Sequence, residues 1–205
     1  ISQVQVNNKA ELTFSSALRS ILRQDPDIIM IGEIRDRETA EIAIRASITG
    51  HLVVSTLHTN SAASTISRLV DMGIEPYLIA DAVSGVIAQR LVRKLCPFCK
   101  KKRYADNTEK VLLGIDVNTE LIIYEPSGCS YCNQKGFFGR IGVYEIMPIT
   151  QSLKDSISKN ETADKISDLA LLEGMSTLRM SAIRYVVEGI TTVSEMKKIS
   201  FEEQF

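Results

Sequence analysis

The sequence predicts an α/β protein whose first region surrounds a parallel sheet, followed by a tetracysteine zinc-binding subdomain and a helical C-terminal subdomain. Short apolar runs alternate with helix-type patterns in the first ~90 residues, which is typical of strand–helix–strand units. All four cysteines stand in two C-x-x-C pairs, and apolar residues return at helical spacing after Gln151. These observations divide the chain into residues 1–95, 96–150 and 151–205.

The elements of the first region follow from its apolar pattern. "ISQVQV" alternates like a short strand, and "TFSSALRSILR" predicts a helix that ends before Pro26, because proline disfavours helical geometry in the residue ahead of it. "DIIMIG" and "HLVVSTL" are continuous apolar runs, which predict strands buried on both faces. Helices are expected over "RETAEIAIRASIT" and "AASTISRLVDMG".

The segment "YLIADAVSGVIAQRLVRKL", residues 77–95, predicts one long helix with an apolar stripe facing a core. In the cysteine-rich region, "ELIIYEP" and "RIGVYEIMPI" are expected to form short strands joined by glycine-rich turns. Apolar periodicity in the last region predicts four helices, over 151–159, 162–173, 176–188 and 191–198.

Composition narrows the class of protein. With 44% hydrophobic and 24% charged residues, the 205-residue chain can form one large domain or two small ones. A net charge of −1 argues against a nucleic-acid binder, and "KKKR" lacks the interleaved aromatics of such a surface. No apolar run approaches the ~20 residues that span a bilayer, and the start has no signal-peptide layout, so a cytoplasmic location is expected. A first residue Ile1 rather than Met suggests a piece of a longer protein.

The cysteines form two closely spaced pairs, Cys96 with Cys99 in "CPFC" and Cys129 with Cys132 in "CSYC". Disulfides are disfavoured in a reducing cytoplasm, and a thioredoxin-like redox site needs only one such pair. Structural zinc explains the count, the pairing and the compartment together. Four thiolates close the coordination shell of Zn²⁺, so we expect a structural rather than a catalytic metal.

Polar side chains follow both apolar strands of the first region. Glu33 comes directly after "IIMIG", where Gly32 leaves room beside it, and His58 follows "HLVVSTL". The carboxyl ends of parallel strands meet at the edge where open α/β sheets bind ligands. A carboxylate there can hold Mg²⁺ or orient an attacking water, and a histidine can donate a hydrogen bond to a terminal phosphate. Each residue alone has an ordinary structural interpretation, but together they indicate a phosphoryl-transfer site.

The stretch "LRSILRQDPDIIMIGEIRDRETAEIAIRASITGHLVVSTLHTNSA" resembles the Walker B and histidine-box region of the type II/type IV secretion ATPase superfamily. The resemblance continues through both cysteine pairs and "FFGRIGVYEIM", and the tetracysteine insertion is typical of type II secretion and type IV pilus assembly ATPases. It implies the second half of a RecA-like P-loop ATPase core, with Glu33 as the Walker B glutamate and His58 in the histidine box. Candidate arginines at nucleotide sites or subunit contacts are Arg19, Arg23, Arg35, Arg68, Arg93 and Arg140.

By this resemblance, the parent is a homo-hexamer that uses ATP and Mg²⁺ to drive secretion or pilus assembly. It is expected at the inner membrane through a platform protein and a cytoplasmic membrane-associated recruitment protein. The phosphate-binding loop G-x-x-x-x-G-K-[ST] does not occur in the chain and is expected before Ile1. We therefore expect this chain to fold, to leave part of its sheet uncovered and not to hydrolyse ATP by itself. The alternative is a non-catalytic, zinc-stabilised assembly module of the same machinery.

Overall fold

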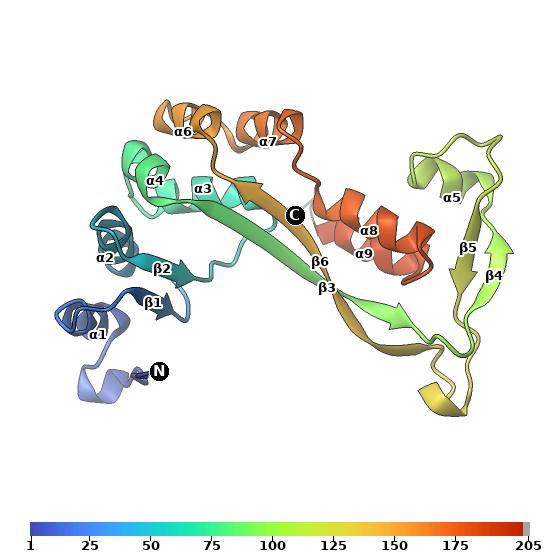
Figure 1. Cartoon of the computed structure of the whole chain (residues 1–205), viewed down its shortest axis with the longest axis horizontal. Helices are drawn as coiled ribbons and strands as arrows, with labels where there is room; N and C mark the ends of the chain where they lie inside the picture. Colours follow the sequence, from blue (N-terminus) through green and yellow to red (C-terminus); the bar gives the residue numbers. More distant parts are fainter. Residues whose placement is uncertain (203–205) are drawn as a thin grey trace. The chain divides into compact units, whose positions relative to one another are not determined.

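The computed structural model describes residues 1–202 and divides into two compact units (Figure 1). Unit 1 contains Ile1–Val86 and Met147–Glu173. Unit 2 contains Ile87–Ile146 and Gly174–Phe205, of which 203–205 lie outside the described residues. Each unit therefore joins two segments that are far apart in the sequence. The three consecutive regions expected from motifs and composition remain a prediction.

The sheet of unit 1 has two parallel strands, β1 (Ile28–Ile31) and β2 (Leu52–Ser55). They alternate along the chain with α1 (Phe14–Ile21) and α2 (Arg37–Ile48), in the predicted order. α2 begins where the side chain of Asp36 accepts a hydrogen bond from a backbone amide in the first turn, which satisfies a donor that has no partner within the helix. These elements confirm the predicted strand–helix–strand unit, whereas Ile1–Val6 forms no strand and is followed by the 3-10 helix η1 (Asn8–Ala10).

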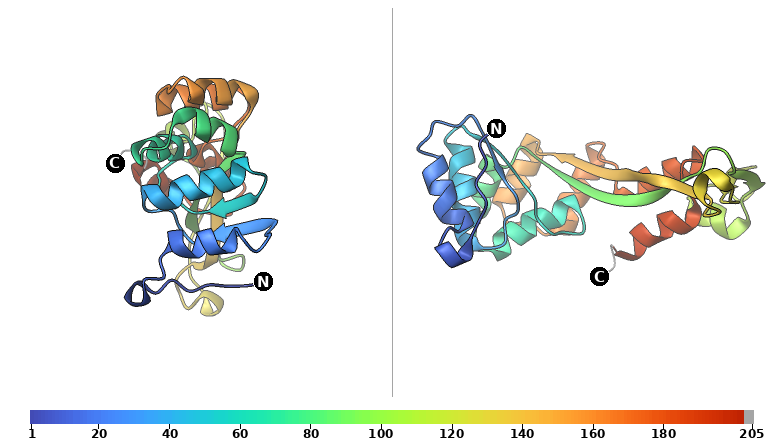
Figure 2. Two further views of the ribbon diagram at one scale, coloured as in Figure 1. Left: turned by 90° about the vertical axis from the view of Figure 1, so that its left-hand side faces the viewer. Right: turned by 90° about the horizontal axis from the view of Figure 1, so that it is seen from below.

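Further helices of unit 1 are α3 (Ala62–Asp71), α4 (Pro76–Ala82), α6 (Gln151–Ser158) and α7 (Ala163–Leu172). α4 packs against α2 and α6, and α3 packs against α7. The left view of Figure 2 shows α1, α2, α4 and α6 stacked side by side, in the order of their colours. The C-terminal helices thus complete the helical layer of the first region.

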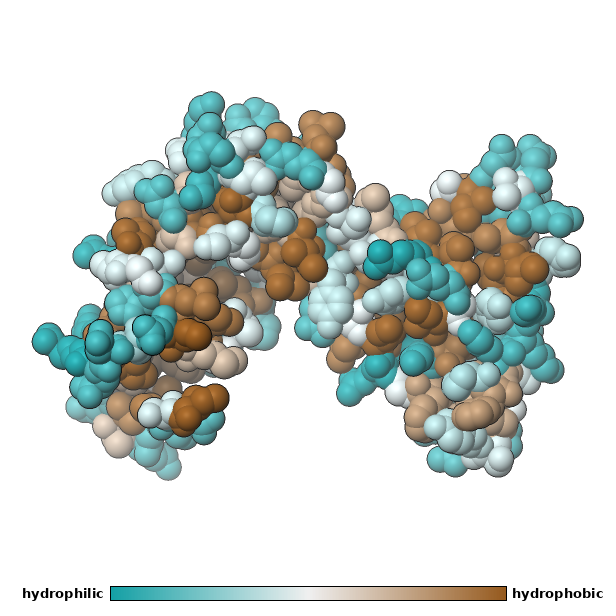
Figure 3. All heavy atoms as spheres, in the orientation of Figure 1, coloured by the Kyte–Doolittle hydropathy of each residue, from teal (hydrophilic) through white to brown (hydrophobic). Residues whose placement is uncertain are grey.

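The sheet of unit 1 is covered on one face only. Ile29 and Ile31 are buried, but Ile28 and Met30 are 65% and 75% exposed. On β2, Leu52 and Val54 are also exposed, and apolar side chains reach the surface in the part of unit 1 that holds these strands (Figure 3). The prediction of strands buried on both faces is therefore wrong for the described chain, because its helices pack on a single face. The expectation that part of the sheet stays uncovered is confirmed.

The long helix predicted over residues 77–95 is also wrong. α4 ends at Ala82, and Gly85–Leu95 forms the strand β3, which pairs with β6 (Phe137–Pro148). The backbone amide of Ile149 donates to the carbonyl of Ser84, and that of Cys96 donates to Gly136, so the two strands run antiparallel.

The apolar stripe expected of that helix, which includes Ile87 and Leu91, does not face a core in the strand. Ala88 and Val92 are buried on the inner face of β3, while Ile87 and Leu91 are exposed on the other. Residues alternate between the faces of a strand, so apolar positions four apart share a face in both a helix and a strand. The pattern alone could not distinguish the two structures.

Unit 2 holds the cysteine-rich segment and the last two helices. β4 (Lys101–Tyr104) pairs antiparallel with β5 (Ile122–Glu125), and the chain between them contains α5 (Asn107–Leu112). α8 (Leu178–Val187) packs against β5 and against α9 (Val193–Glu202). The four predicted C-terminal helices are confirmed, each beginning within two residues of the expected position. Within residues 1–202, the structure contains no helix long and apolar enough to cross a membrane.

Candidate functional site

The loops after β1 and β2 leave the sheet at the same edge. The strands are parallel, with Ile31 opposite Ser55, so both chains emerge together. The backbone amide of Ile34 donates to the carbonyl of Thr56 at 3.0 Å, and the Thr56 hydroxyl donates to the carbonyl of Gly32 at 2.6 Å. These hydrogen bonds fix the two loops against each other, because each holds backbone that would otherwise be free to move.

The fixed loops bring Glu33 and His58 together, as the sequence predicts. Oε2 of Glu33 lies 3.4 Å from Nε2 of His58, and Oε1 lies 2.5 Å from Nη2 of Arg35. The Glu33 side chain is 21% exposed, whereas those of His58 and Arg35 are largely open to solvent. The hydrogen bond from Arg35 lowers the pKa of Glu33 below its ordinary value, and this effect together with that of His58 outweighs the raising effect of burial.

This arrangement supplies an ionised carboxylate beside a histidine. An ionised carboxylate accepts hydrogen bonds from a water molecule or coordinates Mg²⁺, and both roles serve phosphoryl transfer. Arg35 occupies one carboxylate oxygen, a contact that the sequence did not reveal. The sequence placed Arg35 only among the candidate arginines at nucleotide sites or subunit contacts, because spacing does not show in which direction a side chain in a loop points.

The other candidate arginines have different surroundings. In unit 1, Arg19 forms an ion pair with Glu38 at 2.8 Å, and Arg23 and Arg68 are exposed without an ion pair to another described residue. In unit 2, Arg93 is bound to Glu195, and Arg140 is exposed. Roles of these arginines at nucleotide sites or subunit contacts remain a prediction.

The second predicted site is the tetracysteine cluster of unit 2. Sγ atoms of Cys96 and Cys129 lie 3.9 Å apart, those of Cys99 and Cys132 lie 3.8 Å apart, and all four lie within 4.8 Å of one another. All four cysteines are free. A tetrahedron of sulfurs around Zn²⁺, with bonds of about 2.3 Å, has edges of ~3.8 Å. The four thiols therefore fit one zinc ion and do not form disulfides.

Backbone amides point at the sulfurs, as a site for thiolates requires. Gly128 N lies 3.3 Å from Sγ of Cys99, and the amides of Cys129 and Gly136 lie 3.3 and 3.2 Å from Sγ of Cys132. Burial, together with the neighbouring thiols, raises the pKa of the Cys99 thiol to about 11. Burial also raises the pKa of the Cys132 thiol, but the amides of Cys129 and Gly136 and the thiols of Cys129 and Cys99 have a larger opposite effect and bring it to about 6. A thiol that ionises near neutral pH is ready to act as a metal ligand, because the thiolate is the coordinating form.

Gly128 is required by the backbone of this cluster. Its φ of +106° lies in the region that favours glycine, and a Cβ there would come within 2.9 Å of the Gln134 carbonyl oxygen. The cysteine cluster is accordingly built from local turns that bring thiols 33 residues apart into contact.

Sequence comparisons identify the family. A family model described as "Type II/IV secretion system protein" matches residues 1–198. This chain belongs to that family. It is 50% identical over 203 residues to a type II secretion system protein E of Pseudomonas aeruginosa and 49% identical over 201 residues to a type IV pilus assembly ATPase PilB of Myxococcus xanthus. These matches cover 99% and 96% of the chain but 40% and 35% of the two relatives, so the chain spans about 40% of their length or less.

Solved structures of the secretion family have the same α/β fold. The pilus retraction motor PilT with bound ADP matches 91% of this chain and 43% of its own, with a TM-score of 0.63 and 27% sequence identity. The ATPase DotB of Yersinia pseudotuberculosis matches 94% of the chain and 41% of its own, with a TM-score of 0.66 at 21% identity. The second likeness shows the fold alone.

Proposed function

We propose that this chain is part of a motor ATPase of type II protein secretion or type IV pilus assembly, and that Glu33 activates the attacking water or holds Mg²⁺. The pairing of an ionised Glu33 with His58 at the carboxyl edge of β1 and β2 carries this proposal. The names of the related proteins, a type II secretion protein E and a pilus assembly ATPase, support it. His58 donates to a phosphate oxygen in this scheme.

The exposed face of β1 and β2 fits the proposal that the chain forms the second half of a RecA-like core. Strands that are apolar on both faces are covered on both faces in complete α/β sheets, and here one face bears exposed Ile28 and Met30. We propose that the phosphate-binding loop lies in the parent outside this chain, so that the chain alone does not hydrolyse ATP. A hexamer at the cytoplasmic face of the inner membrane, with its platform and recruitment proteins, belongs to the same proposal.

The tetracysteine cluster is proposed to hold one structural Zn²⁺. Support comes from sulfur distances close to the edges of a zinc–thiolate tetrahedron. Zinc would tie the turn after β3 to the turn before β6, since Cys96 and Cys99 follow β3 while Cys129 and Cys132 precede β6. All four ligand positions are filled by protein, which leaves none for substrate.

The substitution Glu33→Gln in the parent protein tests the catalytic proposal. Glutamine keeps the shape but cannot act as a base or balance the charge of Mg²⁺, so we expect at least a ~100-fold loss of ATP turnover with nucleotide affinity retained. His58→Ala should lower ATP turnover less than Glu33→Gln does, because it removes only one phosphate contact. The matched control is Glu41→Gln, which changes an α2 carboxylate paired with Arg37 and should leave turnover unchanged.

Turnover is measured by phosphate release and affinity by binding of a fluorescent ATP analogue. Near-normal turnover of the Glu33→Gln protein would remove Glu33 from the reaction. A parallel loss of nucleotide binding would instead assign it a role in binding.

A further inference from the structure

Three exposed aromatic side chains meet beside the tetracysteine cluster. Phe98 lies between the ligands of the first cysteine pair, Tyr131 lies between those of the second, and Phe138 lies on β6. The ring of Tyr131 lies 4.5 Å from that of Phe98 and 4.6 Å from that of Phe138, measured between centroids. Their exposures are 70% for Phe98, 51% for Tyr131 and 49% for Phe138. Contiguous exposed apolar side chains of this kind mark interaction surfaces, whereas single ones do not.

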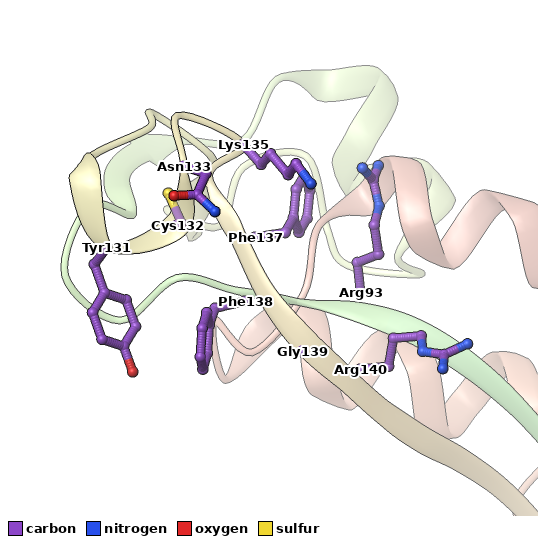
Figure 4. Close-up of a pocket in the computed structure, with 9 residues that line it drawn as sticks. All are labelled: Arg93, Tyr131, Cys132, Asn133, Lys135, Phe137, Phe138, Gly139 and Arg140. Atoms are coloured by element: carbon purple, nitrogen blue, oxygen red, sulfur yellow. The ribbon is translucent and has the colours of Figure 1, made fainter.

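A pocket of about 530 Å³ adjoins this aromatic cluster. Figure 4 shows Tyr131 and Phe138 on one side of the pocket, with Phe137 and Lys135 on the other and Arg140 farther along β6. Asn133 and Arg93 complete the polar part of the lining. Aromatic rings and cations therefore border one hollow within unit 2.

The pocket carries positive charge without a compensating carboxylate of its own. Segments 91–103 and 128–143 contain six and two lysines or arginines, and neither contains an aspartate or a glutamate. Arg93 is neutralised by Glu195, whose carboxylate accepts hydrogen bonds at 2.9 and 3.1 Å. Lys135 and Arg140, however, form no ion pair with another residue of the described chain. Two cations thus remain available beside the aromatic rings.

We propose that the knuckle surface, formed by Phe98, Tyr131 and Phe138 with Lys135 and Arg140, docks an acidic segment of a partner protein. The segment places an apolar side chain against the aromatic cluster and carboxylates against the two cations. Charge complementarity selects such an occupant, because an acidic chain gains two ion pairs while a basic one is repelled. This docking role lies in unit 2 and is independent of the hydrolysis assigned to Glu33 in unit 1.

The arrangement of the rings favours a peptide over a lipid surface. The rings of Phe98 and Tyr131 pack edge to face, at an interplanar angle of 66°, so they hold each other in place. A hollow next to fixed rings accepts a single inserted side chain, the usual anchor of a peptide interface. The aromatic side chains enriched at bilayer interfaces are Trp and Tyr, whereas two of the three rings here are Phe.

Selection from a displayed library of random twelve-residue peptides tests the proposal, with the parent protein kept reduced and supplied with one equivalent of zinc. We expect selected peptides to be rich in Asp and Glu and to contain at least one Phe, Leu, Ile or Trp. The strongest peptide is then synthesised, and its dissociation constant is measured by fluorescence anisotropy. Lys135→Glu and Phe98→Ser should each weaken binding at least ten-fold, with the effect of Lys135→Glu shrinking as salt rises.

Matched controls are Lys159→Glu and Leu172→Ser, which change an exposed lysine and an 86% exposed apolar side chain of unit 1. Both should bind the peptide with unchanged affinity, and every variant should keep its zinc content and its circular dichroism spectrum. Selection of peptides without acidic enrichment would overturn the proposal. So would a dissociation constant equal to that of the wild type in both Lys135→Glu and Phe98→Ser. Binding to phosphatidylglycerol vesicles that is lost in the same two variants would assign the surface to a membrane instead, and a changed oligomeric state would assign it to a second copy. ATP turnover of the Phe98→Ser protein gives a separate readout, so failure here does not affect the role of Glu33.

Discussion

The ion pair between Arg93 and Glu195 predicts a defined loss of stability when its buried carboxylate is neutralised. Glu195 is 3% exposed and accepts hydrogen bonds from the Arg93 amide at 2.9 Å, from its guanidinium at 2.9 and 3.1 Å, and from Lys198 at 2.5 Å. Burial raises the pKa of Glu195, but the opposite effect of the hydrogen bonds from Arg93 and Lys198 is larger. The pKa therefore falls from 4.5 to about 2. A gap of this size corresponds to about 3 kcal/mol of folding free energy at neutral pH.

Glu195→Gln removes the charge while keeping the shape. Because the cationic side chains of Arg93 and Lys198 are 51% and 62% exposed, water takes over part of their interaction. We therefore expect a loss of about 2 to 3 kcal/mol in the free energy of unfolding at pH 7. Glu188→Gln, which changes an exposed carboxylate 4.0 Å from Arg184, is the matched control and should cost less than about 0.5 kcal/mol.

The pH dependence follows from the lowered pKa. A carboxyl that ionises more readily in the folded protein contributes stability above its unfolded pKa, and the contribution disappears as the pH falls toward the folded value. The difference between wild type and Glu195→Gln should therefore be constant above about pH 5 and narrow below about pH 4.5, by up to ~1.4 kcal/mol per pH unit. Urea unfolding of both proteins, followed by circular dichroism between pH 7 and pH 4, measures this difference in the free energy of unfolding. A difference below 1 kcal/mol at pH 7, or one that widens on acidification, would refute this account of the pair.

Three other outcomes follow from the same structure. Zinc analysis should find about one equivalent per chain, and a metal-free native protein would contradict this. Cys96→Ser should lower the zinc content and speed hydrogen exchange between residues 96 and 132, while unit 1 stays protected. Arg35→Ala removes the contact that lowers the pKa of Glu33, so the acidic limb of the ATPase pH–rate profile of the parent should move to higher pH; an unmoved limb would show that Arg35 does not control this carboxylate. Gly189→Ala should lower the free energy of unfolding by about 2 to 4 kcal/mol, since glycine adopts φ +67° there and a Cβ would lie 2.4 Å from the Tyr124 ring. A smaller loss in urea unfolding would mean that the ring moves aside easily.

Features that depend on short stretches of chain could be predicted from the sequence. The two C-x-x-C pairs specify their turns locally, and the structure brings their sulfurs within 4.8 Å of one another. The strands before Glu33 and His58 were identified by their apolar runs, and parallel pairing then requires both residues to emerge at one edge. The resemblance to secretion ATPases was confirmed by the family match.

Features that depend on distant partners were decided only by the tertiary structure. Gly85–Leu95 becomes a strand because β6 supplies its hydrogen bonds from more than 40 residues away, and its apolar spacing suits a helix equally well. Arg93 and Glu195, 102 residues apart, carry no pattern that pairs them. Burial of the β1 and β2 faces likewise depends on which helices cover them, and the described helices cover only one. The sequence thus determines the local geometry and the chemistry of the side chains. Strand pairing and burial are decided by long-range contacts, which form only when the chain folds.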